Sequence, residues 1–475
     1  MIPVQAVEDQ TIAVLGLGRS GKATAAALEA GGARVVAWDD GVDTREAAAA
    51  EGLSIVDLTR DEGWEGVAAL IVSPGIPHLY PRPHPVIQQA YARGIPVDND
   101  IGLFFRSYAT DDWQGFDRAP RVVAVTGSNG KSTTTALIHH IIEQAGYPTV
   151  MGGNIGLPIL GQPPLEPNLK GPGVYVLELS SYQIDLTHSL DCDVAVLLNI
   201  TPDHLDRYDG FDGYVASKAR LFAMQSADHV AVIATEDEPS REIAQNLRHS
   251  RESGNPSPDI MGQGEVGEMD PRLRGDDVKE VGSSDIDPVA QLTWPALQGP
   301  HNAQNAAVAI AVAKALGIDE ATIANALVSY ASLPHRMQAV GTRNGVLYVN
   351  DSKATNAAST APALAAWPPV DGRPRIHWIL GGVAKSDNLD ECVPHFGNVA
   401  HAYTIGEAGH MFADLLRGSM AVDDSEMLSA AVRRAARIAQ PGDVVLLSPA
   451  CASFDQFRDF EARGDAFVAA VGALE

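Results

Sequence analysis

Short apolar runs alternate with Ala- and Leu-rich stretches along almost the whole of this 475-residue chain. The clearest runs are TIAVLG, RVVAWDD, VVAVTG, VYVLELS, DVAVLLNIT, HVAVIAT, IHWILGG, HAYTIGE and DVVLLS. Runs that are apolar at nearly every position are typical of parallel strands buried on both faces, and the stretches between them suit crossover helices. The sequence therefore predicts an α/β fold with mostly parallel sheets.

Two breaks in this alternation predict three domains. The polar segment 107–120 and the Ser332-Leu333-Pro334 step are the breaks. They give domains of residues 1–108, 109–332 and 333–475. We expect Rossmann-like N- and C-terminal domains on either side of a central P-loop-type ATPase domain.

Residues 253–288 depart from the alternation. They contain six Gly and four Pro and no aromatic residue. Such a segment cannot bury enough apolar surface to offset the entropy lost on ordering. We predict a flexible surface insertion without a chemical role, and a regulatory or docking loop is the alternative.

The charge balance and the Cys content exclude several classes of protein. The 34 Lys and Arg against 60 Asp and Glu give a net charge of -26, which argues against nucleic-acid and anionic-membrane partners. Cys192, Cys392 and Cys451 are too few and too distant for a disulfide framework or a zinc site. The start MIPVQAVEDQ lacks the features of a secretion signal, and no apolar run approaches the ~20 residues of a membrane helix. We expect a cytoplasmic protein.

The first glycine-rich motif is Gly16-Leu17-Gly18-Arg19-Ser20-Gly21. It follows TIAVL and opens a predicted helix to about Ala30, after which RVVAW ends at Asp39-Asp40. In this strand-turn-helix-strand order, free N–H groups at the helix N-terminus can receive a diphosphate. A nicotinamide dinucleotide and a UDP-sugar both carry one, so both remain open. The turn Ser73-Pro74-Gly75 follows AALIV and is expected at the same sheet edge.

The second glycine-rich motif, TGSNGKST at 126–133, lies between the strand VVAV and an amphipathic helix that carries Leu137, Ile141 and Ile142 on one side. Backbone N–H groups can hold phosphates there, a Lys can reach the terminal phosphates, and a hydroxyl can hold magnesium. A standard P-loop has Gly where this chain has Val125, so the loop is a variant. We predict that it binds a nucleoside triphosphate.

Together with GGNIG, ELSSYQ, NITPDHLDRY and HNAQNAAVA, the second motif resembles the Mur ligase superfamily of ATP-dependent amide-forming ligases. The resemblance covers the chain outside 253–288. The C-terminal motifs LPHRMQ, NDSKATN, LGGVAKSDN and SPACASFDQF are similar to those of the branch that adds D-glutamate. The resemblance implies addition of D-glutamate to UDP-N-acetylmuramoyl-L-alanine through an acyl phosphate, in peptidoglycan precursor synthesis. It also implies ATP, two Mg²⁺ ions and a carbamylated lysine.

The resemblance also implies roles for individual residues. The ATP site would comprise Gly127, Ser128, Asn129, Gly130, Lys131, Ser132, Thr133, Asn302, Asn305, Arg336 and Asp351. The catalytic residues would be Lys131, Glu178, His204 and Lys218, and the magnesium ligands would be Ser132, Glu178, His204 and carbamylated Lys218. The UDP-linked substrate would contact Gly18, Arg19, Ser20, Asp39, Ser73, Pro74, Gly75 and Asn154. D-Glutamate would contact Thr355, Lys385, Ser453, Phe454 and Phe460, although Phe460 could equally be a core residue.

Three other functions remain open at this stage. A nicotinamide-dependent oxidoreductase would explain the first motif but leaves TGSNGKST and NDSKATN unexplained. A nucleotide-binding regulator would lack turnover, and a related ligase would use a different amino acid or a folate. We expect the chain to act as a monomer on small-molecule substrates.

Overall fold

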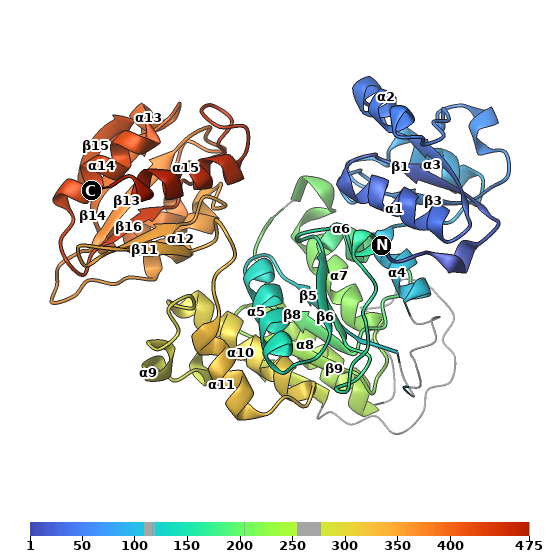
Figure 1. The fold of residues 1–475 in the computed structure, drawn as a ribbon, viewed down its shortest axis with the longest axis horizontal. Helices are drawn as coiled ribbons and strands as arrows, with labels where there is room; N and C mark the ends of the chain where they lie inside the picture. Colours follow the sequence, from blue (N-terminus) through green and yellow to red (C-terminus); the bar gives the residue numbers. More distant parts are fainter. Residues whose placement is uncertain (109–115, 117–118, 204, 254–276, 475) are drawn as a thin grey trace. The chain divides into compact units, whose positions relative to one another are not determined.

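The computed structural model describes residues 1–108, 116, 119–203, 205–253 and 277–474, and Figure 1 shows its fold. The chain forms two compact units, of which the first contains residues 1–282 and 307–326 and the second contains residues 283–306 and 327–475. Three mostly parallel sheets in three domains confirm the predicted α/β class.

The N-terminal sheet has four parallel strands in the order β2-β1-β3-β4. Its strands are β1 (Thr11–Leu15), β2 (Arg34–Trp38), β3 (Val67–Val72) and β4 (Val97–Asp98). The helices of this domain are α1 (Arg19–Ala30), α2 (Val42–Ala50), α3 (Pro85–Ala92) and α4 (Asp100–Ser107). Because β1 and β3 are neighbours, the turns that follow them lie side by side at the carboxyl edge of the sheet.

The central sheet has six parallel strands in the order β10-β9-β8-β5-β7-β6. Its strands are β5 (Arg121–Thr126), β6 (Thr149–Gly153), β7 (Val174–Glu178), β8 (Val194–Leu197), β9 (Val230–Ala234) and β10 (Val278–Val281). The helices are α5 (Lys131–Gln144), α6 (Ser181–Leu186), α7 (Gly210–Ala223), α8 (Glu238–Ser253), α9 (Pro288–Gln291), α10 (Pro300–Ala315) and α11 (Glu320–Ser329). Leu137, Ile141 and Ile142 of α5 are fully buried, which confirms the predicted amphipathic helix.

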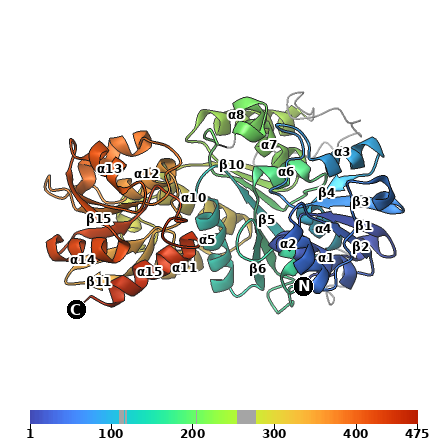
Figure 2. The same ribbon diagram turned by 90° about the horizontal axis from the view of Figure 1, so that it is seen from above.

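The C-terminal sheet has the order β11-β12-β16-β13-β14-β15, with only β11 and β12 antiparallel among the described strand pairs. Its strands are β11 (Gln338–Arg343), β12 (Val346–Asn350), β13 (Ile376–Gly381), β14 (Val399–Ile405), β15 (Ala421–Glu426) and β16 (Val444–Leu447). Its helices are α12 (Ala357–Ala365), α13 (Gly409–Leu416), α14 (Leu428–Ile438) and α15 (Phe460–Gly472). Helices α12 and α13 pack on one face, and α14 and α15 pack on the other (Figure 2). Alternate residues of each strand therefore enter two separate cores.

All nine apolar runs form strands, namely β1, β2, β5, β7, β8, β9, β13, β14 and β16. The nine runs do not include the interior strands β3 and β12 or five of the six described edge strands, namely β4, β6, β10, β11 and β15, whereas the sixth edge strand, β2, is among them. An edge strand has one neighbour instead of two, so it does not need an apolar residue at every position. The polar sequence AVDDSE of β15 is an example.

The prediction of a flexible insertion over 253–288 is wrong at its C-terminal end. Val278–Val281 forms β10, which pairs in parallel with β9. Val278 is buried while Lys279 and Glu280 are exposed, so the strand was hidden in a short polar-looking segment. Residues 254–276, and residues 109–115 and 117–118 of the predicted linker, lie outside the described residues.

None of the helices within the described ranges combines the length and the apolar character that crossing a bilayer requires.

We predict that Leu197→Ala lowers the free energy of unfolding by about 2–5 kcal/mol, because Leu197 is fully buried in β8 and the substitution leaves a cavity. Leu169→Ala is the matched control, because Leu169 is fully exposed and its removal should change stability by less than about 0.5 kcal/mol. Urea unfolding of both variants measures the difference. Equal effects would contradict the assignment of Leu197 to the core.

Candidate active site

The second glycine-rich motif forms the connection between β5 and α5. Helix α5 begins at Lys131, and its N-cap Gly130 has the left-handed conformation with φ 84°. Val125, the departure from a standard P-loop, is fully buried within β5, and its carbonyl accepts a hydrogen bond from the Leu179 N–H. The strand therefore continues through the position where a standard loop would begin.

Asn199, two residues after the end of β8, braces this loop. Its side chain accepts a hydrogen bond from the Asn129 N–H at 2.8 Å and donates to the Asn129 carbonyl at 3.2 Å. The Asn199 carbonyl accepts from the Ser128 N–H at 2.8 Å. The Ser128 hydroxyl donates to the Thr201 carbonyl and accepts from the Thr201 N–H, both at 2.9 Å. Asn199 was not among the predicted site residues, although its place after a buried strand was a usable signal.

The Lys131 ammonium group lies over its own loop. Its Nζ donates to the carbonyls of Gly127 and Ser128 at 2.8 and 2.9 Å. Thr133 lies half-buried in the first turn of α5. The predicted phosphate-binding residues 127–133 are therefore contiguous around one helix N-terminus, which favours anions.

Glu178, at the carboxyl end of β7, accepts hydrogen bonds from two other predicted residues. Its Oε2 accepts a hydrogen bond from the Ser132 hydroxyl at 2.5 Å, and its Oε1 accepts from Asn154 Nδ2 at 3.0 Å. Gly153 permits this approach, because a Cβ there would lie 2.2 Å from the Glu178 carbonyl oxygen. A buried carboxylate and a hydroxyl are hard oxygen ligands of the kind that Mg²⁺ prefers.

Lys218 of α7 is buried beside the same loop, with 1% of its surface exposed. Its Nζ donates to the Gly127 carbonyl at 2.9 Å and lies 3.4 Å from Thr126 Oγ1. Burial and the positive charge of Lys131 lower the pKa of Lys218 well below its ordinary value. The neutral amine is therefore favoured far more than at a surface lysine, which suits covalent chemistry at its nitrogen.

His204 lies outside the described residues. Among the residues that are described, no group of three His, Cys, Asp or Glu side chains is placed to hold a metal ion.

The first glycine-rich motif forms the β1–α1 turn, and α1 begins at Arg19 with Gly18 as its N-cap. Gly21 is required by close packing, since a Cβ there would lie 1.8 Å from the Gly16 carbonyl oxygen. Asp39 braces the turn, because its Oδ2 accepts from the Leu17 N–H at 2.8 Å.

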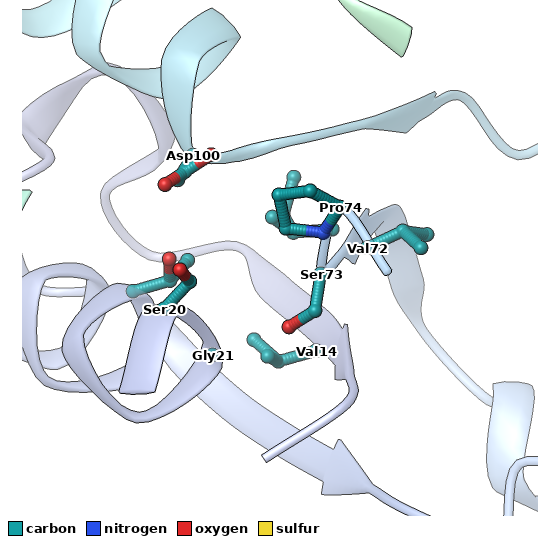
Figure 3. Close-up of a pocket in the computed structure, with 9 residues that line it drawn as sticks. Val14, Ser20, Gly21, Val72, Ser73, Pro74 and Asp100 are labelled. Carbon is teal, nitrogen blue, oxygen red and sulfur yellow. The ribbon is translucent and has the colours of Figure 1, made fainter. Parts of the chain in front are cut away.

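The turn after β3 meets the first motif. The Ser73 hydroxyl donates to the Gly16 carbonyl at 2.9 Å. Ser20, Ser73 and Pro74 line a small pocket together with Asp100 (Figure 3). Gly75 is exposed, and no atom lies within 4 Å of a Cβ built on it. Most of the predicted UDP-substrate residues are therefore gathered around two adjacent turns.

Asp100 was missed by the sequence analysis. It is the first residue of α4 and is 2% exposed, and burial raises the pKa of its carboxyl to about 6. A hydrogen bond with the Gln183 side chain opposes that rise. The neighbouring Asn99 also donates to the Gln183 carbonyl at 2.7 Å, so α4 and α6 are joined beside the pocket.

The predicted nucleotide residues that belong to the second unit are Asn302, Asn305, Arg336 and Asp351. Asn305 Nδ2 donates to Asn302 Oδ1 at 3.1 Å, which confirms that the two side chains share one face of α10. Asp351 follows β12 and accepts from the Ser448 hydroxyl at 2.8 Å and from the Met337 N–H at 3.1 Å. Burial raises the pKa of Asp351 to about 7, and the nearby Arg336 opposes the rise.

Arg463, which is 1% exposed, joins the three C-terminal segments that carry the predicted D-glutamate residues Thr355, Lys385 and Ser453. Its guanidinium donates to the Ser352 hydroxyl and carbonyl at 3.0 and 2.8 Å, and to the Gly381 and Ala452 carbonyls at 3.5 and 3.3 Å. These contacts reach the loops after β12, β13 and β16. Arg463 carries no local sequence signal, because its burial depends largely on Ser352 and Gly381, which lie 111 and 82 residues away in the chain.

The five predicted D-glutamate residues differ in environment. Ser453 is buried, Thr355 and Phe460 are half-buried, and Lys385 and Phe454 are exposed. Phe460 begins α15, and the Lys353 ammonium lies 3.8 Å from its ring centroid. The Phe460 ring thus contacts a cation within the same loop cluster and is not enclosed in the core.

Two family models match the chain, the Mur ligase middle domain over residues 125–313 and the Mur ligase, glutamate ligase domain over residues 335–451. The chain belongs to the Mur ligase family, as the sequence resemblance predicted.

Within this family, the chain is 54% identical to a protein of Novosphingobium aromaticivorans named UDP-N-acetylmuramoylalanine--D-glutamate ligase, over 100% of this chain and 97% of the relative. It is 52% identical to the protein of the same name from Sphingopyxis alaskensis, over the full length of both. Among solved structures, UDP-N-acetylmuramate-alanine ligase of Thermotoga maritima matches with a TM-score of 0.54 and 16% identity, covering 98% of this chain and 99% of that structure. That likeness shows the fold.

We predict that Asp351→Asn removes part of the pH dependence of stability. Between the unfolded pKa near 3.8 and the folded value of about 7, only the native state keeps the proton, so stability falls as pH rises through this window. The difference is worth up to about 4 kcal/mol at about 1.4 kcal/mol per pH unit. Urea unfolding of the unsubstituted chain and of Asp351→Asn at pH 4 and pH 7.5 measures this contribution. If both proteins lose the same stability between the two pH values, Asp351 does not have a raised pKa in the native state.

Proposed function

We propose that this chain is an ATP-dependent ligase that adds D-glutamate to UDP-N-acetylmuramoyl-L-alanine, giving ADP and phosphate. The observation that carries the proposal is full-length identity of 50% or more to relatives named for this activity. The geometry supports it, because separate glycine-rich turns follow β1 and β5, and each opens a helix N-terminus to a phosphorylated molecule. The product would serve peptidoglycan precursor synthesis.

The proposed reaction begins with attack of the L-alanyl carboxylate on the terminal phosphate of ATP, which breaks the bond to the β-phosphate, releases ADP and gives an acyl phosphate. The amine of D-glutamate then attacks the acyl phosphate, a tetrahedral intermediate forms, and phosphate leaves. The first step brings two anions together, and Lys131 at the mouth of the phosphate loop would offset their repulsion. Asn302, Asn305, Arg336 and Asp351 would bind the rest of the nucleotide.

Magnesium fits the residues present at the carboxyl end of β7. Ser132 and Glu178 offer oxygen ligands that hydrogen-bond each other at 2.5 Å, and we propose that they hold one ion with the nucleotide phosphates. Magnesium, when bound, would supply positive charge beside the reacting phosphate. A second ion would use Glu178, His204 and a carbamylated Lys218.

The carbamate assignment is supported by the environment of Lys218. A neutral amine reacts with carbon dioxide, and the lowered pKa of the buried Lys218 favours that form. Carbamylation would replace a cation with a carboxylate-like anion next to Lys131, and so would exchange a repulsive contact for an attractive one.

The loops joined by Arg463 would receive D-glutamate. Thr355, Lys385 and Ser453 offer hydroxyl and cationic donors for its carboxylates, and Phe454 and Phe460 would border the side chain.

The turns around Gly18, Ser73 and Asn154 would receive the UDP-linked substrate. We propose three domains, of residues 1–108, 109–332 and 333–475. We also propose that the protein acts in the cytoplasm, where its proposed nucleotide substrates are dissolved, and that it acts as a monomer.

The decisive experiment is a phosphate-release assay on the purified chain. Release should require ATP, UDP-N-acetylmuramoyl-L-alanine and D-glutamate together, and Lys131→Ala should lower turnover about 100- to 1000-fold. A panel with L-glutamate, D-alanine, diaminopimelate and a folate distinguishes the related ligases, and a fluorescence titration with NADH tests the oxidoreductase. Release that is indifferent to D-glutamate would end the proposal.

We further predict that Lys218→Ala is inactive and partly regains activity with added formate or acetate, because a small carboxylate can enter the vacated space. Lys218→Arg is the matched control, since it keeps a cation, cannot form the carbamate and leaves no room for the acid. Steady-state turnover with increasing acid measures the effect. Full activity of Lys218→Ala without acid would exclude the carbamate.

A further inference from the structure

Three tyrosines form a continuous row between the two glycine-rich sites. The Tyr182 and Tyr208 rings are stacked, with centroids 5.9 Å apart and planes 10° apart. The Tyr208 and Tyr214 rings meet edge to face at 5.4 Å. Tyr208 and Tyr214 are buried, while Tyr182 is partly exposed. We call these three residues the tyrosine row.

One end of the row meets Arg207. The Arg207 guanidinium carbon lies 4.5 Å from the Tyr182 ring centroid, and Nη1 donates to the Gly75 carbonyl at 3.2 Å. Gly75 belongs to the turn whose Ser73 hydroxyl binds the Gly16 carbonyl. Arg207 thus contacts the turn proposed to bind the UDP-linked substrate and the first ring of the row.

The other end of the row meets the phosphate loop. The Tyr214 hydroxyl lies 3.1 Å from Ser128 Oγ, within hydrogen-bond distance. The Lys218 ammonium lies 4.7 Å from the centroid of the same ring. The last ring therefore contacts one residue proposed to bind ATP and the lysine proposed to be carbamylated.

We propose that Arg207 is a positioning residue which, through the tyrosine row, makes binding at the UDP-substrate turn and at the phosphate loop strengthen each other. Closely packed rings cannot shift independently, so a change at one end displaces the next ring. The planar Arg207 guanidinium holds a ring face and a carbonyl at once, which fixes the Gly75 turn relative to the row. This inference rests on the proposed function.

A purely structural role for Arg207 predicts something different. If Arg207 only held the Gly75 turn and Tyr182 together, its loss would lower the stability of the fold and leave the two binding equilibria independent. Coupling between sites is a measurable ratio of affinities and must be the same in both directions. The ratio therefore distinguishes the two roles.

The test is calorimetric titration of the full chain with a non-hydrolysable ATP analogue and Mg²⁺, with and without UDP-N-acetylmuramoyl-L-alanine. We expect the substrate to tighten analogue binding at least 5-fold in the unsubstituted chain. In Arg207→Ala the ratio of the analogue affinities with and without the substrate should fall to about 1. The affinity for the analogue alone should stay within 2-fold of that of the unsubstituted chain. Arg207→Lys keeps a cation near Tyr182 but loses the planar fork, and should give an intermediate ratio.

Arg93→Ala is the matched control. Arg93 also lies over an aromatic ring, that of Trp64 at 5.4 Å, and pairs with Asp61, but it contacts neither glycine-rich turn. It should keep the ratio of the unsubstituted chain. Thermal unfolding of both Ala variants shows whether either change is a general loss of fold.

Three outcomes would overturn the proposal: a ratio of 1 in the unsubstituted chain, an unchanged ratio in Arg207→Ala, or an equal fall in Arg93→Ala. Failure of the proposed function looks different, because the unsubstituted chain would then release no phosphate with D-glutamate. An active, uncoupled enzyme would reject only the role of Arg207.

Discussion

The parallel alignment of β5, β6 and β7 is the constraint on which the central site depends. Parallel strands end at the same edge of a sheet, and each of these three is followed by a residue or turn with a proposed role. Ser132, Asn154 and Glu178 come from three separate segments and are joined by two hydrogen bonds. The alignment therefore lets Ser132 and Asn154 both donate to the Glu178 carboxylate, although the three residues are far apart in the sequence.

Two lysines at one carbonyl give this site its electrostatic character. Lys131 and Lys218 both donate to the Gly127 carbonyl, at 2.8 and 2.9 Å. Like charges so close, with one of them buried, disfavour a second protonated amine. The loop therefore favours loss of the positive charge of Lys218, which carbamylation of the amine would bring about, whereas bound anionic phosphates would offset the repulsion without removing that charge.

Most interior strands were predictable from their apolar runs, and most edge strands were not, with the edge strand β2 as an exception. Interior parallel strands such as β5 and β13 need apolar side chains on both faces, which leaves continuous runs in the sequence. Edge strands such as β10 and β15 have one open side and mix charged with apolar residues. The same limit explains the error over residues 277–288, where two valines around Lys279 and Glu280 are enough for a paired edge strand.

By itself, the sequence determined the α/β class, the two glycine-rich turns and the family, because tight turns and buried strands require particular residues locally. Tertiary structure decided which residues support those turns. Asn199 braces the phosphate loop, Arg463 joins three loops, Asp100 lines the pocket and Arg207 meets Tyr182, mostly through partners distant in the chain. Burial and long-range contact are properties of the folded chain, so Asp100 and Arg463 leave no local pattern in the sequence, whereas the place of Asn199 after a buried strand was a usable signal.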